Sequence, residues 1–206
     1  MAPAKGKAKK ASNILAEAIA PRLKPAGVAA TKARLSEFTE AAATTLRPDG
    51  VAAFPDGTSK AGGFLASVME YAPFLRSLIL AEPGRLFDIL NSDPGDRARR
   101  LVAATAVSWR GASQAALMAT LRRGRQEMAL LTALADLAGV WDVPAVTAAL
   151  TGFADAAVGA AVRFILTEAM SNGAIDLPDP DGPEVGSGWI VLGLGKYGGG
   201  ELNYSS

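Results

Sequence analysis

The sequence contains neither cysteine nor histidine among its 206 residues, and both absences narrow the chemistry open to the chain. Without cysteine there is no disulfide, no thiolate metal site and no cysteine nucleophile. Without histidine the chain lacks the usual general base near neutral pH and the commonest zinc ligand. Any chemistry would therefore come from carboxylates, lysine, arginine, hydroxyls, backbone amides or a metal bound by oxygen atoms.

Aromatic residues and net charge are also scarce, at 6% of the sequence and a formal charge of +1. Few aromatics and abundant alanine favour helices over sheets. Balanced charge gives no reason to expect nucleic acid or an acidic membrane surface as a partner. The basic start of the chain carries no apolar signal sequence, and no apolar run approaches the about 20 residues of a membrane span. We therefore expect a cytoplasmic protein that binds neither membrane nor nucleic acid.

Composition and hydrophobic periodicity divide the chain into four regions. Residues 1–12 are basic and predict a disordered tail. Residues 13–175 carry apolar residues at helical spacing between prolines and glycines, and they predict a helical domain. Residues 176–188 are rich in Pro, Asp and Gly and predict a loop, whereas residues 189–206 predict the start of another domain.

Local signals place several helix ends within the helical region. The apolar spacing predicts one helix over 27–46 and a longer one over 113–137, which Gly139 would end. An acidic cap at Asp142 followed by Pro144 predicts the start of the next helix.

The long predicted helix carries a cluster of basic residues. One of them, Arg123, precedes Glu127 by one helical turn, and this spacing predicts a solvated, partly paired face rather than a phosphate site.

The most informative segment is an apolar strand, Trp189–Leu192, that runs into a glycine-rich turn containing Lys196. Glycine has no Cβ, so such a turn lets backbone amides approach a phosphate closely. A lone strand cannot pair its own amides and carbonyls. Residues after about 176 are therefore expected to pack poorly in this chain.

Two familiar phosphate-binding patterns fit this turn badly. Gly193 to Gly198 satisfies the G-x-G-x-x-G spacing of dinucleotide-binding oxidoreductases, but the residues that follow are poor helix formers and the ribose-binding acid is missing. A P-loop needs Ser or Thr after its lysine, and here Tyr197 follows Lys196. A third pattern is the strand and turn of a nucleotidyltransferase, in which two aspartates on the next strand bind magnesium.

The third pattern is supported by a specific resemblance. The segment Leu192–Ser206 closely resembles a motif of the bifunctional glutamine synthetase adenylyltransferase/adenylyl-removing enzyme family. Residues 121–127 (LRRGRQE) and 136–139 (DLAG) resemble that family's Arg-rich helix and its ending. Residues 71–76 (YAPFLR) resemble a family helix start, with Ala72 in place of the usual Ser.

The resemblance covers about residues 60 to 206 and implies a mainly α chain. Its multi-helix region would run into the first strand and Gly-rich turn of a truncated α/β nucleotidyltransferase domain of the polymerase-β type. The nucleotide-binding residues implied by the motif are Gly195, Lys196, Gly198, Gly199, Ser205 and Ser206.

The resemblance also implies an activity and partners. The chain would be the N-terminal, adenylyl-removing part of an enzyme that removes AMP from glutamine synthetase by phosphorolysis, under control of a PII-type signal protein, with ATP, AMP, ADP and phosphate as ligands. The aspartates that hold Mg²⁺ would follow directly after Ser206, so this chain alone is expected to be inactive. The alternative is a non-catalytic helical module that binds glutamine synthetase.

Overall fold

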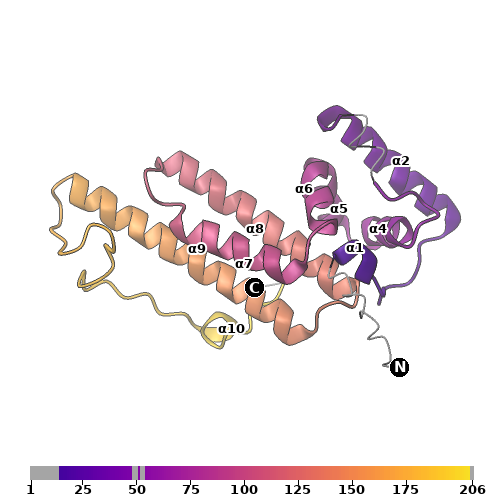
Figure 1. The fold of residues 1–206 in the computed structure, drawn as a ribbon. Helices are drawn as coiled ribbons and strands as arrows, with labels where there is room; N and C mark the ends of the chain where they lie inside the picture. Colours follow the sequence, from indigo (N-terminus) through magenta and orange to yellow (C-terminus); the bar gives the residue numbers. More distant parts are fainter. Residues whose placement is uncertain (1–13, 48–50, 52–53, 205–206) are drawn as a thin grey trace, which may run out of the picture.

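The computed structural model describes residues 14–47, 51 and 54–204, and its regular structure over those residues is entirely helical (Figure 1). The helices are α1 (Leu15–Ala18), α2 (Val28–Thr45), α4 (Lys60–Tyr71), α5 (Pro73–Ala81), α6 (Pro83–Leu90), α7 (Pro94–Val107), α8 (Gln114–Leu137), α9 (Val143–Ser171) and α10 (Gly195–Gly198). The mainly helical prediction is confirmed. The predicted tail over 1–12 lies outside the described residues.

The predicted strand Trp189–Leu192 is the main difference from the expected secondary structure. It adopts no regular structure and pairs with no neighbour within the described part of the chain. All four side chains are at least half exposed. The segment forms no strand because a sheet requires a second strand to pair with its backbone N–H and C=O groups.

Proline and polar caps set the helix ends. Proline occupies the first turn of α5, α6, α7 and α9, where its missing N–H would have no partner in any case. The first turns of α4, α7, α8 and α9 are capped by side chains that accept a backbone N–H, from Ser59, Asp93, Ser113 and Asp142. The bounds predicted for α2, for α8 and for the start of α9 are confirmed to within one or two residues.

The helices form two connected parts (Figure 1). Helices α7, α8 and α9 lie alongside one another as an elongated bundle, and helices α1, α2, α4, α5 and α6 gather at one end of it. One continuous apolar core joins the two parts and runs from Leu15 in α1 to Phe153 in α9. A smaller cluster around Trp109 and Phe164 closes the far end of the bundle.

The N-terminal segment around α1 completes the C-terminus of α8. Leu15 and Ile19 are fully buried. The N–H of Ala20 donates to the carbonyl of Ala138 at 2.6 Å, and the N–H of Arg22 donates to that of Leu137 at 2.9 Å. The last carbonyls of a helix have no partner within the helix. This segment therefore supplies both apolar burial and hydrogen bonds to the end of α8.

Gly139 is where this contact is tightest. Its φ is +73°, and a Cβ built on it would lie 2.6 Å from the carbonyl oxygen of Ala20. We expect Gly139→Ala to lower the free energy of unfolding by about 2 kcal/mol, through the strained backbone and the displaced segment. Gly173→Ala is the matched control, because its φ is +69° but no atom lies within 4 Å of the added Cβ.

Urea unfolding of both variants measures the two contributions. Gly173→Ala should show the backbone cost alone, and Gly139→Ala a larger loss. Equal losses in the two variants would contradict a tight contact between the N-terminal segment and α8.

Helix α9 corrects one expectation drawn from the sequence. It has 29 residues, and an 18-residue window within it has a mean hydropathy of 1.6, which is long and apolar enough for a membrane span. An apolar run of this length was not predicted from the sequence, although Asp155 and Arg163 are among the few charged residues of α9. Only 22% of that window is buried. The helix packs along α7 and α8 (Figure 1).

Candidate functional site

The glycine-rich turn forms the single helical turn α10. The N–H of Gly198 donates to the carbonyl of Leu194 at 3.2 Å, and that of Gly199 donates to Gly195 at 3.0 Å. A Cβ on Gly198 would lie 2.4 Å from the carbonyl oxygen of Gly193, so the backbone could not approach itself this closely with any other residue. The side chain of Lys196 is exposed between these glycines.

Two hydrogen bonds attach this turn to α9. The hydroxyl of Tyr197 donates to Oδ1 of Asp155 at 2.8 Å, and the N–H of Leu202 donates to Oγ1 of Thr151 at 3.3 Å. Partial burial raises the pKa of the Tyr197 phenol, and the bond to Asp155 raises it further. The phenol therefore stays protonated at neutral pH and acts as a donor.

The chain beyond the turn lies over α5, α8 and α9. Leu202 and Tyr204 help to line a mainly apolar cavity of about 700 Å³ between these helices. Partial burial, followed in importance by the Asp136 carboxylate, raises the pKa of Tyr204 to about 12. Tyr204 is nevertheless 52% exposed, so it contacts these helices on one side only.

A groove of about 570 Å³ separates the turn from α9. Its walls are the glycine turn, the segment just before it, one face of α9 and Glu184. Arg163 of α9 donates from Nε to Oε1 of Glu184 at 2.6 Å. This hydrogen bond is the main cause that lowers the pKa of the Glu184 carboxyl. One basic side chain of α9 thus lies in the same groove as the glycine turn.

The predicted loop over 176–188 is held at two points. Arg163 binds Glu184, and Arg110, in the turn after α7, binds the Asp181 carboxylate at 3.2 Å. Leu177, within this loop, is buried. The prediction that the chain packs poorly after about 176 is therefore wrong for the loop. It is confirmed for 188–204, where no side chain is fully buried.

The lowered pKa of Glu184 predicts that this attachment depends on pH. The carboxylate stabilises the loop above its ordinary pKa of 4.5, and the stabilisation is lost as pH falls through the lower pKa of the folded state. We expect amide exchange at Val185 to accelerate in that acidic range. Glu184→Gln, which cannot ionise, should exchange at one pH-corrected rate throughout. A transition of the same size in this variant would contradict the assignment.

The structure brings four of the six predicted nucleotide-binding residues together in α10, namely Gly195, Lys196, Gly198 and Gly199. The other two, Ser205 and Ser206, lie outside the described residues. Asp155 and Arg163 were not predicted as neighbours of the turn. Both look like ordinary polar positions of a long helix, so the sequence carried no signal for them.

The predicted pairing of Arg123 with Glu127 is wrong. Glu127 binds Arg97 of α7 instead, with 2.7 Å between Oε1 and Nη2. The correct partner lies on a neighbouring helix, and a periodicity within one helix cannot show it.

Magnesium needs several oxygen ligands at one point, usually with carboxylates among them. No group of three or more acidic side chains that could hold a metal ion occurs within residues 14–47, 51 and 54–204. The two carboxylates that line the groove beside the turn, Asp155 and Glu184, are already engaged by Tyr197 and Arg163. The described residues therefore do not fit a magnesium site.

Comparison with known proteins identifies the family. A family model described as glutamate-ammonia ligase adenylyltransferase matches residues 63–206. Three bacterial proteins, each named bifunctional glutamine synthetase adenylyltransferase/adenylyl-removing enzyme, are similar to the chain. The protein of Rhodopseudomonas palustris (strain HaA2) is 48% identical over 143 residues. That of Xanthobacter autotrophicus (strain ATCC BAA-1158 / Py2) is 48% identical over 137 residues, and that of Brucella suis biovar 1 (strain 1330) is 40% identical over 152 residues.

These matches cover most of the chain but little of its relatives. They include 69%, 66% and 73% of the chain, and 14%, 14% and 16% of the respective relatives. No solved structure matches the chain. The family model covers well over half of the sequence and includes the whole glycine turn. The chain therefore belongs to the glutamate-ammonia ligase adenylyltransferase family.

Proposed function

We propose that this chain is the N-terminal part of a cytoplasmic enzyme that transfers adenylyl groups to and from glutamine synthetase, and that it begins the adenylyl-removing half. The observation that carries the proposal is the coincidence of two features in one segment. The family match extends through residues 189–204, and the same residues form an exposed glycine turn with a lysine beside a groove.

In this proposal the turn binds the phosphates of the nucleotide. Gly195 leaves space for phosphate oxygens close to the backbone, since no atom lies within 4 Å of the position of a Cβ there, and Lys196 supplies a positive charge that faces solvent. Gly198 instead lets the turn close against the carbonyl of Gly193. Asp155 acts as a positioning residue because it holds the turn through Tyr197. Phosphorolysis would break the bond between the AMP phosphorus and the tyrosine oxygen of glutamine synthetase. Inorganic phosphate would take the adenylyl group to form ADP, and the tyrosine hydroxyl would be restored.

Further parts of the proposal require groups beyond the described residues. We propose that Mg²⁺ is the cofactor, that residues after Ser206 supply its ligands, and that a PII-type signal protein and ATP are further partners. The described residues alone assign no step of the reaction to a metal.

Expression of the complete open reading frame tests the proposal. The product is mixed with adenylylated glutamine synthetase and inorganic phosphate, and ADP release is measured beside the chain of residues 1–206. We expect ADP from the longer product only. A longer product that folds, binds glutamine synthetase and releases no ADP would contradict the assignment to adenylyl removal.

The second candidate is a helical module that binds glutamine synthetase without catalysis. One observation favours it: within the described residues both apolar clusters are built from residues before 165, so the helices do not need the glycine turn for their core. Biolayer interferometry of residues 1–206 against immobilised glutamine synthetase tests it directly. Saturable binding without ADP release would support this module, and no association would exclude it.

A further inference from the structure

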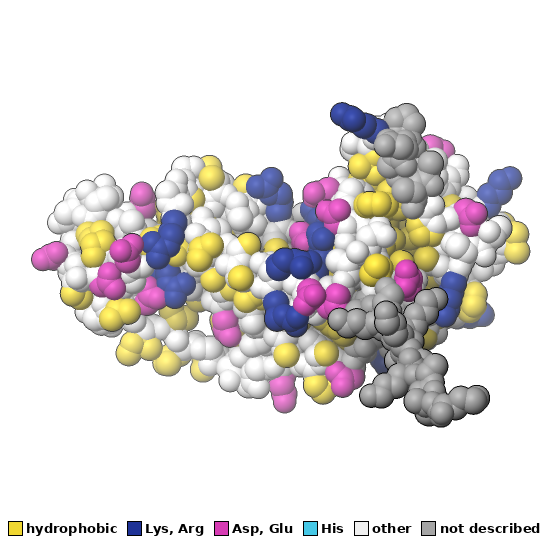
Figure 2. All heavy atoms as spheres, viewed as in Figure 1, with side chains coloured by type: hydrophobic (Ala, Val, Ile, Leu, Met, Phe, Trp, Pro, Cys, Tyr) yellow, Lys and Arg dark blue, Asp and Glu magenta, His cyan; other side chains and the backbone are white. Residues whose placement is uncertain are grey.

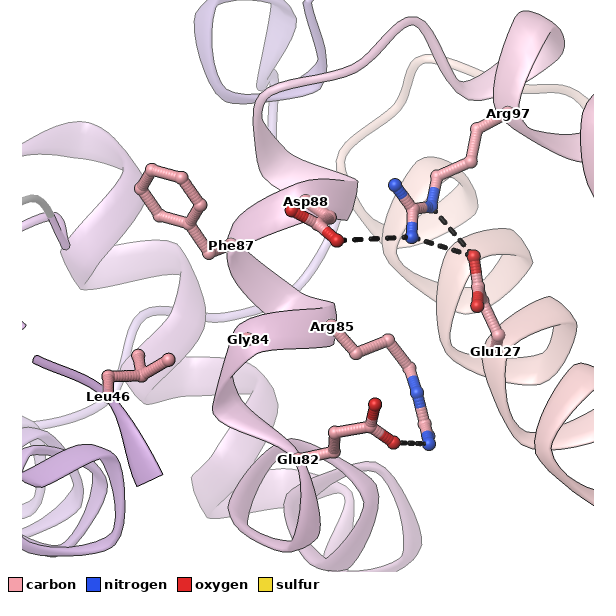
Figure 3. A pocket seen from close by; sticks show the side chains of 8 residues that line it. All are labelled: Leu46, Glu82, Gly84, Arg85, Phe87, Asp88, Arg97 and Glu127. Carbon is pink, nitrogen blue, oxygen red and sulfur yellow. Dashed lines mark hydrogen bonds and ion pairs between the residues drawn. The ribbon is translucent and has the colours of Figure 1, made fainter. Parts of the chain in front are cut away.

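A second cavity, of about 370 Å³, lies between α6, α7 and α8 and is separate from the glycine turn (Figure 3). Basic and acidic side chains gather over this part of the surface, where α6 and the start of α7 meet (Figure 2). Two arginines line the cavity from different helices, Arg85 from α6 and Arg97 from α7. They differ in their hydrogen-bond partners: Arg97 is paired with Glu127, whereas one nitrogen of Arg85 has no acceptor.

Arg97 is paired with two carboxylates. Its Nε and Nη2 lie 2.9 and 2.7 Å from Oε1 of Glu127, and Asp88 lies 3.8 Å from Nη2 (Figure 3). Arg97 and Glu127 thus neutralise each other across the gap between α7 and α8.

Arg85 is not fully engaged, although its side chain is only 5% exposed. Its Nη2 donates to a carboxylate oxygen of Glu82 and, at 3.4 Å, to Oε1 of Gln126. Its Nη1 is buried and has no hydrogen-bond partner. A buried donor without an acceptor is costly, and more so when it carries charge. Such a group needs an explanation, and a missing anion is one.

Glu82 is the residue that covers this guanidinium. Its side chain is 53% exposed, and although it stands at the N-cap of α6 it caps no backbone N–H. It binds Arg85 through a single nitrogen, whereas the guanidinium can hold a carboxylate through two parallel hydrogen bonds. Glu82 can therefore move into solvent at little cost and leave both Nη atoms of Arg85 to another acceptor.

We propose that this cavity is a binding site for a small molecule with a single carboxylate, which displaces Glu82 and binds both Nη atoms of Arg85. The charges at the site select a monoanion. Arg97 is neutralised by Glu127, and Asp88, whose side chain is 63% exposed, leaves one negative charge at the cavity edge, which disfavours a doubly charged phosphate. The cavity volume suits a molecule of a few carbon atoms beyond the carboxylate.

The test uses sodium acetate as the probe, with sodium chloride at equal ionic strength and inorganic phosphate as comparisons. Binding is followed through the ¹⁵N and ¹H signals of the Arg85 guanidinium in residues 1–206. We expect a saturable shift with acetate, none with chloride, and weaker binding of phosphate. Tighter binding of phosphate than of acetate, or equal shifts with acetate and chloride, would overturn the proposal.

Variants of the two partners sharpen the test. Glu82→Gln removes the internal competitor, so acetate should bind at least about 5-fold more tightly and raise the Tm of this variant more than that of the parent. Arg85→Lys should lose the saturable response. The matched control is Asp96→Asn, because Asp96 and Arg99 form the same i,i+3 pair at an exposed position. An unchanged acetate affinity in Glu82→Gln would overturn the proposal even if Arg85→Lys failed to fold.

Discussion

Leu134→Ala is expected to lower the free energy of unfolding by about 3 kcal/mol, among the largest effects of any single substitution in this chain. Leu134 lies on α8, has no exposed surface and belongs to the main apolar core. Truncation removes buried methyl groups and leaves a cavity that the surrounding helices fill only in part. Since α8 contacts both parts of the fold, the loss is expected in the cooperative unfolding of the whole helical region.

Leu194→Ala is the matched control for this substitution. It removes the same atoms from a side chain that is 81% exposed in the segment before α10, so the expected change is within about 0.5 kcal/mol. Urea titrations of both variants, followed by circular dichroism at 222 nm, measure the difference. Similar losses at the two positions would show that the core does not depend on α8 as the structure indicates.

Helix ends were predictable from the sequence because their causes are local. Ser113 and Asp142 accept an N–H three residues along the chain, and Pro73 and Pro83 begin helices without losing a hydrogen bond. Each signal acts within one turn of the helix. A single sequence therefore carries enough information to place these ends.

Contacts between distant segments were not predictable in the same way. The N-terminal segment binds the end of α8 through backbone atoms, which carry no residue-specific signal. Gly124 stands among arginines in the sequence. In the structure a Cβ there would lie 2.9 Å from the ring of Phe153, so this glycine sets how closely α8 and α9 cross. Helical spacing likewise offers Glu127 one arginine, Arg123, but its partner in the packed structure is Arg97 of another helix.

The same contrast between local signals and long-range contacts applies to the candidate site. Its glycines and Lys196 form one short motif, which the backbone chemistry of glycine and the family resemblance both indicate from the sequence alone. The α9 residues beside the motif lie far from it in the sequence: Asp155 binds Tyr197, 42 residues further along, and Arg163 lines the same groove. Polar residues on an amphipathic helix are common, so their role becomes visible only when the turn lies against α9.

Substitution of Lys196 by methionine in the complete open reading frame is expected to lower the rate of ADP release by about 100-fold. The prediction rests on the proposed function. Lys196 is exposed in α10 directly after Gly195, where no atom lies within 4 Å of the position of a Cβ and the backbone is open to a phosphate. Methionine keeps most of the length and apolar stem of the side chain but removes its charge. Lys196→Arg, which keeps the charge with a different geometry, should retain more activity than Lys196→Met.

A second lysine provides the control for a general effect of charge. Lys60 is exposed at the start of α4, away from the groove, so Lys60→Met should leave the rate within about 2-fold of the parent. Lys196 is exposed in a single turn that contributes nothing to the core, so Lys196→Met should not change the Tm. A 100-fold loss with an unchanged Tm would place the positive charge at the reacting phosphates. Full activity in Lys196→Met would mean that the glycine turn binds no phosphate, and would favour the non-catalytic helical module instead.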